Sequence, residues 1–143
     1  MFGMFKKKAA ATKVVLHKVE NRDLMEAIVA GAVLVAFADG DCSSEELTTL
    51  HGIIENNDNL KHFGSEIGAT IDKYSGMYES GKRLAKVKLM KEITDVQADE
   101  EQKIEAFIIA IEIADADGEI DDQEMAVLKD IGKSLGLNPE NYI

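Results

Sequence analysis

The sequence predicts an all-α fold, a helical bundle of about seven helices, from three observations. The 143-residue chain has a single proline, Pro139, so almost all of its length is free to be helical. Apolar residues recur every three or four positions over long segments. A helix–acidic loop–helix unit occurs twice, with Asp39-Gly40 in the first loop and Asp117-Gly118 in the second. The bundle is therefore expected to contain an internal duplication.

The helices are expected at intervals along the whole chain. A first helix is predicted at roughly 9–19, and a second begins after Asn21, a candidate N-cap, and ends at Asp39-Gly40. This second helix is apolar on nearly every face and should be buried at the centre. The remaining helices are predicted over residues 43–55, 65–78, 81–96, 99–117 and 121–135, with a short turn at 60–63.

The duplication organises the predicted domain. An offset of 78 aligns residues 30–53 with 108–131, and 8 of these 24 positions are identical. The identities fall on core-facing alanines and on the loop acids, which indicates two related halves, about 22–55 and 100–136, packed about a pseudo-twofold axis. We expect one helical domain over 20–143, preceded by a basic and apolar segment with its helix over 1–19.

The charge limits the classes of partner that the chain can bind, and the cysteine content indicates the cell compartment in which it works. The net charge is −11, and the five lysines of residues 1–18 leave 11 bases and 27 acids for the remainder. A body this acidic repels phosphate backbones, so no nucleic-acid partner is expected. The single cysteine fits a reducing compartment. The longest uncharged apolar run, residues 27–38, is shorter than a membrane span, and a cytoplasmic location is predicted.

Residues 1–8 place four large apolar side chains beside three lysines. This pattern allows weak contact with an anionic membrane surface. The alternative, which we favour, is a frayed chain end ahead of the first helix.

The acidic loops are the candidate functional site. Carboxylate oxygens suit Ca²⁺, Mg²⁺ or Mn²⁺, and the candidate ligands are Asp39, Asp41, Glu46, Asp117, Glu119, Asp121 and Glu124. A standard EF-hand is excluded, because Ile113 and Val35 occupy the position of the first calcium ligand. Helix capping is the alternative, since Ser43-x-x-Glu46 and Asp121-x-x-Glu124 are both capping patterns.

Catalysis has less support in the sequence. The histidines His17, His51 and His62 lie on separate segments without a nucleophile motif, and no glycine-rich phosphate loop is present. No enzymatic activity is therefore predicted. Glu26 and Glu112, in the two most apolar helices, either join a metal site from within or point outward at a helix edge.

Three features together resemble one known family. They are the duplicated Ala-Asp-Gly-x-x-[Ser/Asp]-x-x-Glu, the entry Phe/Met-Glu-x-x-x-Ala, which here is Met25-Glu26-x-x-x-Ala30, and the ending Ser134-Leu135-Gly136-Leu137-Asn138-Pro139. The chain resembles the TerB tellurite-resistance family over roughly residues 22–142. The resemblance implies about seven helices, no known enzymatic activity, and metal-chelating acids at Asp39, Glu46, Asp117 and Glu124. It also implies TerD-type proteins and the membrane protein TerC as partners, at the inner membrane face.

The predicted function is that of a TerB-like, non-enzymatic cation-binding or adaptor domain. Through the resemblance, it would act in the response to tellurium ions and in phage and colicin resistance. The alternative is a structural or assembly protein that uses the same scaffold without binding a metal.

Overall fold

The structure, a computed structural model, describes residues 21–40 and 42–143. This part of the chain contains six α-helices and no strand, which confirms the predicted all-α class. The helix expected at 9–19 and the apolar, basic residues 1–8 lie outside the described residues. None of the described helices is both long and apolar enough to cross a membrane.

The helices follow the predicted order closely. The first described helix covers residues 21–36 and is called the central helix below. The others are α2 (Ser44–Glu55), α3 (Ser65–Ser80), α4 (Lys82–Thr94), α5 (Glu100–Ala114) and α6 (Asp122–Leu135), with 3₁₀ turns at Lys61–Phe63 and Pro139–Asn141. Asn21 was expected to cap the central helix but is itself helical. Its side-chain amide instead donates a hydrogen bond to the carbonyl oxygen of Asn59, at 3.4 Å.

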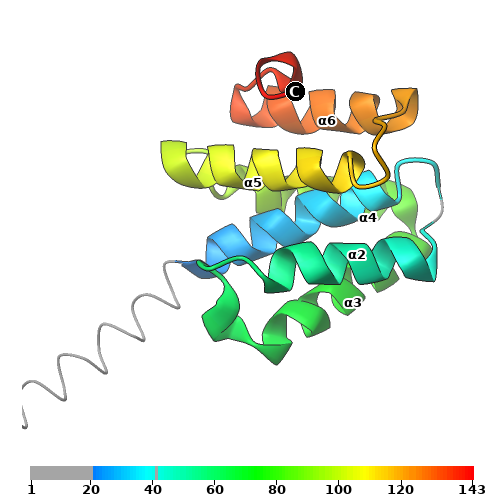
Figure 1. Cartoon of the computed structure of the whole chain (residues 1–143), viewed down its shortest axis with the longest axis vertical. Helices are drawn as coiled ribbons and strands as arrows, with labels where there is room; N and C mark the ends of the chain where they lie inside the picture. The colour runs from blue at the N-terminus through cyan, green and yellow to red at the C-terminus, as the bar shows by residue number, and fades with distance from the viewer. Residues whose placement is uncertain (1–20, 41) are drawn as a thin grey trace, which may run out of the picture.

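The central helix forms the core of the bundle. Every residue from Leu24 to Phe37 is buried except Glu26, which is half-buried. Figure 1 shows this helix between α5 and α2, with α6 packed over α5 and α3 on the far side of α2. A methyl group added at Gly31 would lie 3.8 Å from Cβ of Ala110, so small residues allow the central helix to approach α5 closely.

The two apolar helices end in the same way. Gly40 has a φ of 95° and Gly118 a φ of 91°, a left-handed backbone that favours glycine. The N–H of Gly40 donates to the carbonyl of Phe37 at 2.8 Å, and that of Gly118 donates to the carbonyl of Asp115 at 2.9 Å. After each glycine a loop leads to the next helix, and Figure 1 shows both loops at the same end of the bundle. This arrangement brings the candidate ligands of the two halves together.

Candidate functional site

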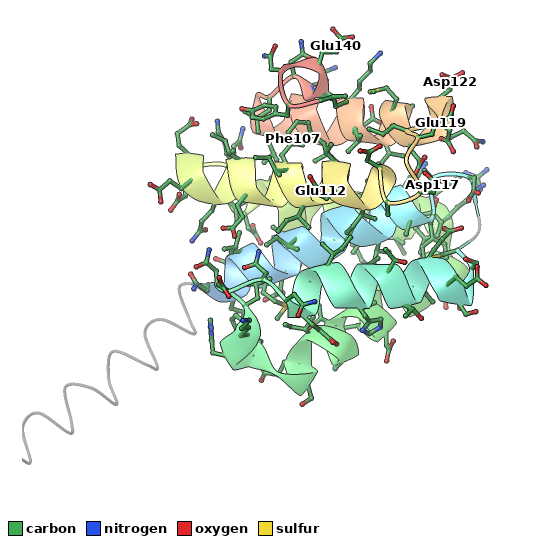
Figure 2. The ribbon with its side chains drawn as sticks, viewed as in Figure 1. Phe107, Glu112, Asp117, Glu119, Asp122 and Glu140 are labelled. Atoms are coloured by element: carbon green, nitrogen blue, oxygen red, sulfur yellow. The ribbon has the colours of Figure 1, made fainter. Side chains whose placement is uncertain are left out.

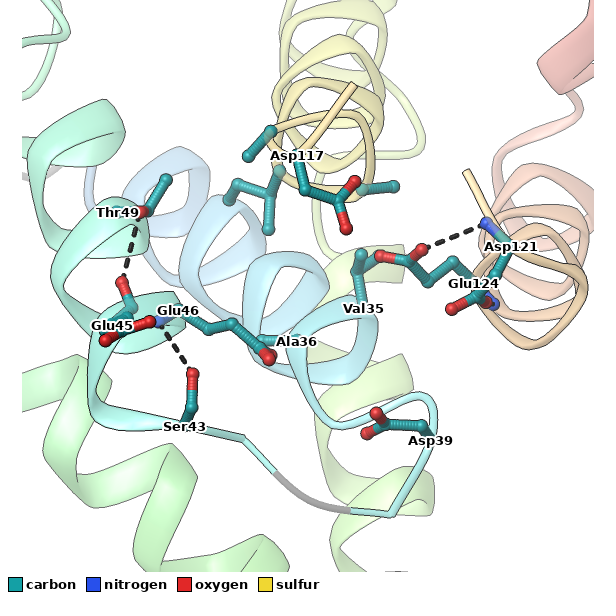
Figure 3. A pocket seen from close by; sticks show the side chains of 13 residues that line it. Val35, Ala36, Asp39, Ser43, Glu45, Glu46, Thr49, Asp117, Asp121 and Glu124 are labelled. Carbon is teal, nitrogen blue, oxygen red and sulfur yellow. Dashed lines mark hydrogen bonds between the residues drawn. The ribbon is translucent and has the colours of Figure 1, made fainter. Parts of the chain in front are cut away.

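Both acidic loops line one pocket of about 380 Å³. Most of the lining consists of positions that the offset of 78 makes equivalent in the two halves: Val35 and Ile113, Ala36 and Ala114, Asp39 and Asp117, Ser43 and Asp121, and Glu46 and Glu124. Figure 3 shows the side chains of Glu46 and Glu124 extending toward each other from opposite sides of this pocket. The pocket therefore draws on both halves of the chain, and neither half forms it alone.

The first loop is held by one helix cap and one tyrosine. The hydroxyl of Ser43 accepts a hydrogen bond from the N–H of Glu46 at 3.1 Å, which caps α2. The hydroxyl of Tyr78, on α3, donates to the carbonyl of Phe37 at 3.4 Å, and their rings pack with centroids 4.8 Å apart. Burial, with a smaller contribution from the charge of Asp39, raises the pKa of Tyr78, so the hydroxyl keeps the proton that it donates.

The second loop has a complete capping box. The carboxylate of Asp121 accepts from the N–H of Glu124 at 2.7 Å, and the carboxylate of Glu124 accepts from the N–H of Asp121 at 3.0 Å. Asp117 is oriented by the N–H of Glu119, which donates to its Oδ1 at 3.1 Å. These bonds orient the side chains of Asp117 and Glu124 at the pocket.

The electrostatics of the pocket favour a positive charge. Burial, together with the charges of Asp121 and Asp117, raises the pKa of the Glu124 carboxyl to about 7, although the N–H of Asp121 acts in the opposite direction. The pocket also lies where the central helix and α5 end. The negative ends of two helix dipoles therefore add to the carboxylate charges. A cation entering this pocket would relieve repulsion that the folded chain otherwise carries.

The structure brings together five of the seven predicted ligands. Asp39, Glu46, Asp117, Asp121 and Glu124 all line the pocket. Asp41 lies outside the described residues, so its predicted role stays a prediction.

Three other candidate acids, Glu119, Glu112 and Glu26, do not line the pocket. Glu119 is exposed and farther out along the loop, near Asp122, as Figure 2 shows. Glu112 is exposed on α5, and Glu26 accepts a hydrogen bond from the hydroxyl of Tyr74 at 3.2 Å.

Glu45 and Thr49 also line the pocket, although neither was predicted as a site residue. The hydroxyl of Thr49 donates to the carbonyl of Glu45 at 3.1 Å, one turn back along α2. Their counterparts in the second half are Gln123 and Val127, so a comparison of the two halves could not reveal them. Helical spacing could have predicted Thr49, because this residue lies three positions after Glu46 and shares its face of α2.

The donor chemistry of the pocket fits a hard divalent cation, since carboxylates and hydroxyls line it. Among the described residues, however, no three His, Cys, Asp or Glu side chains are grouped closely enough to hold one ion directly. A pocket of about 380 Å³ instead has room for an ion with its water shell. Six waters at roughly 30 Å³ each occupy about 180 Å³. The residues therefore fit a hydrated ion that the carboxylates contact through water.

The fold and the pocket define a class of protein: an all-α domain in which two acidic loops line one pocket. The family model described as "Tellurite resistance protein TerB" matches residues 25–143, most of the chain. The chain belongs to the TerB family. Searches of the curated proteins and of the solved structures give no match to this chain.

Proposed function

We propose that this chain is a non-enzymatic, cation-binding domain of tellurite resistance, with its binding site in the acidic pocket. Family membership supports the link to tellurite resistance. The observation that supports cation binding is the convergence of Asp39, Glu46, Asp117 and Glu124, two acids from each half, on one pocket. The proposal includes the roles that the resemblance implies: phage and colicin resistance, and action with TerD-type proteins and TerC at the inner membrane face.

The proposed ion is Mg²⁺, Ca²⁺ or Mn²⁺, held between the two loops. Mg²⁺ fits a site with water-mediated contacts best, because it loses its waters reluctantly and is often bound through them. Asp117 and Glu124 are the strongest candidate contacts, because internal hydrogen bonds already orient both carboxylates. Asp39 and Glu46 would add negative charge around the ion from the other side of the pocket. Binding would join the two halves of the chain and stabilise the bundle.

The alternative is a structural or assembly protein in which the acids serve only the helices. The capping bonds support it, because Ser43 caps α2 and Asp121 with Glu124 caps α6 without any ion. Capping does not account for Asp39 or Asp117, however, which lie before the glycines and outside both caps. The two functions differ in whether a cation stabilises the folded chain.

Isothermal titration calorimetry of the full chain with Ca²⁺, Mg²⁺ and Mn²⁺ distinguishes them. Wild type should release or absorb heat with a saturable isotherm, and its melting temperature should rise. The variant Asp117→Asn/Glu124→Gln should lose at least tenfold in affinity. Asp72→Asn/Glu79→Gln, which removes two exposed acids of α3, is the matched control and should bind as wild type does. No heat and no stabilisation at millimolar cation would favour the structural alternative.

A further inference from the structure

A second recess, separate from the acidic pocket, lies between α4 and α6. Its volume is about 560 Å³, within the range of roughly 300–1,000 Å³ typical of ligand pockets. Leu34 of the central helix lines it, together with Val87 and Met90 of α4 and Val127 of α6. We call it the α4–α6 groove. It shares no lining residue with the acidic pocket, so the proposed cation site does not explain it.

The apolar surface of the groove continues onto the exposed side of α4. Leu84 is 63% exposed and Val87 is 59% exposed, and the two lie one helical turn apart. The interior side of α4 is formed by Ala85, Leu89 and Ile93 instead, so packing within the bundle does not require Leu84 or Val87. Two neighbouring aliphatic side chains left in water beside an apolar recess are typical of a docking surface.

The charge around the groove has the opposite sign to the rest of the body. Helix α4 carries five bases, Lys82, Arg83, Lys86, Lys88 and Lys91, and one acid, Glu92. Two of these bases, Lys86 and Lys91, line the groove itself. None of the five forms a salt bridge with another described residue, whereas Arg22, Lys61 and Lys103 each do. The basic charges of α4 are therefore available to a partner.

We propose that the α4–α6 groove binds an amphipathic helix of a partner protein, with acids along the flank that faces α4. Apolar side chains of that helix, spaced by three or four residues, would fill the recess over Leu34 and contact Val87. Its acids would pair with Lys86 and Lys91. The opposite rim carries Asp130 and Ser134 of α6, so the flank that faces α6 would be neutral or basic.

Three other occupants fit less well. A flat anionic bilayer would contact Leu84 and Val87 but leave the recess unfilled and place Asp130 against negative headgroups. The chain's own residues 1–18 carry five lysines and no acid, so their charge repels that of α4. A second copy of the chain would pair two different surfaces, because the groove is basic and the acidic pocket lies elsewhere. Contacts of that kind lead to rings or open filaments.

The test uses two labelled peptide helices and the full chain. Both peptides carry leucine at positions i, i+3, i+4 and i+7; one has glutamate along one flank and the other has lysine there. Fluorescence anisotropy should show the glutamate peptide binding at least tenfold more tightly than the lysine peptide. Leu84→Ser/Val87→Ser should lower the affinity for the glutamate peptide at least tenfold. Ile108→Ser, at a 40% exposed residue of α5 outside the groove, should leave its affinity unchanged.

A charge reversal makes the test specific for α4. In Lys86→Glu/Lys91→Glu the preference should change to the lysine peptide, a result that non-specific hydrophobic binding would not produce. Thermal melts monitored by circular dichroism check that each variant is folded. Equal affinity for both peptides, or no effect of Leu84→Ser/Val87→Ser, would overturn the proposal. It would also be overturned if anionic phosphatidylglycerol vesicles bound through Leu84 and Val87 while the peptides did not. The proposal would also be overturned if sedimentation velocity showed that the chain self-associates and that these substitutions abolish the self-association. The groove would then bind a second copy of the chain and not a partner protein.

Discussion

Removing the charge of Glu124 should stabilise the protein, and more so as the pH rises. The pKa of this carboxyl is about 7 in the folded chain, whereas the ordinary pKa of a glutamate carboxyl is 4.5. Between these values the folded chain keeps the proton and the unfolded chain releases it, so rising pH lowers the free energy of unfolding. A shift of this size corresponds to ~3 kcal/mol at 1.36 kcal/mol per unit. Because Glu124 is only partly buried, solvent screening reduces the effect to about 1–2 kcal/mol.

The assay is urea unfolding of wild type and Glu124→Gln at pH 4, 6 and 8, with EDTA present. Glutamine keeps the oxygen that accepts from the N–H of Asp121, so the variant loses the charge but not the cap. The two proteins should be equally stable at pH 4, and Glu124→Gln should be more stable by about 1–2 kcal/mol at pH 8. Glu79→Gln, at an exposed position of α3, controls for the loss of one negative charge. A difference that does not change with pH, or a less stable variant at pH 8, would refute the reasoning.

Three further substitutions test contacts within the bundle. A Cβ at Gly132 would lie 2.4 Å from the carbonyl oxygen of Leu137, whereas one at Gly31 would have no neighbour closer than 3.8 Å. Gly132→Ala should therefore destabilise the chain by about 1–2 kcal/mol, even after the gain in helix propensity is counted. Gly31→Ala should stabilise the chain by about 1 kcal/mol. Urea unfolding measures both changes, and a Gly132→Ala variant more stable than Gly31→Ala would contradict the packing of α6. Tyr78→Phe removes the hydrogen bond to the carbonyl of Phe37 and should cost about 1 kcal/mol in the same assay. An unchanged stability would show that this bond does not hold the first loop.

The local signals of the sequence predicted most of the fold. Apolar spacing located every described helix, and the two Asp-Gly pairs marked where the apolar helices end, at glycines with φ of 95° and 91°. The capping patterns at Ser43 and Asp121 predicted the starts of α2 and α6. These features depend on hydrogen bonds within a few residues, so the sequence determines them directly.

The composition of the site was harder to predict, because it depends on how distant helices pack. Glu45 and Thr49 reach the pocket only because α2 lies beside the end of the central helix, and the second half has no matching residues to reveal them. Glu119 was a candidate ligand, but it is exposed and does not line the pocket, and the hydrogen bond that joins it to Asp117 comes from its backbone N–H. The α4–α6 groove depends on three helices and has no short sequence motif.

Paramagnetic NMR with Mn²⁺ tests the central claim most directly, because it reports which residues surround the ion. At substoichiometric Mn²⁺, the amide signals of Ser43 and Glu46 in the first half and of Asp117 and Glu124 in the second should broaden together. Exposed acids elsewhere, such as Asp72 of α3, should be unaffected, and Asp117→Asn/Glu124→Gln should abolish the broadening in both halves. Broadening confined to one loop, or spread evenly over the acidic surface, would contradict a cation site shared by the two loops.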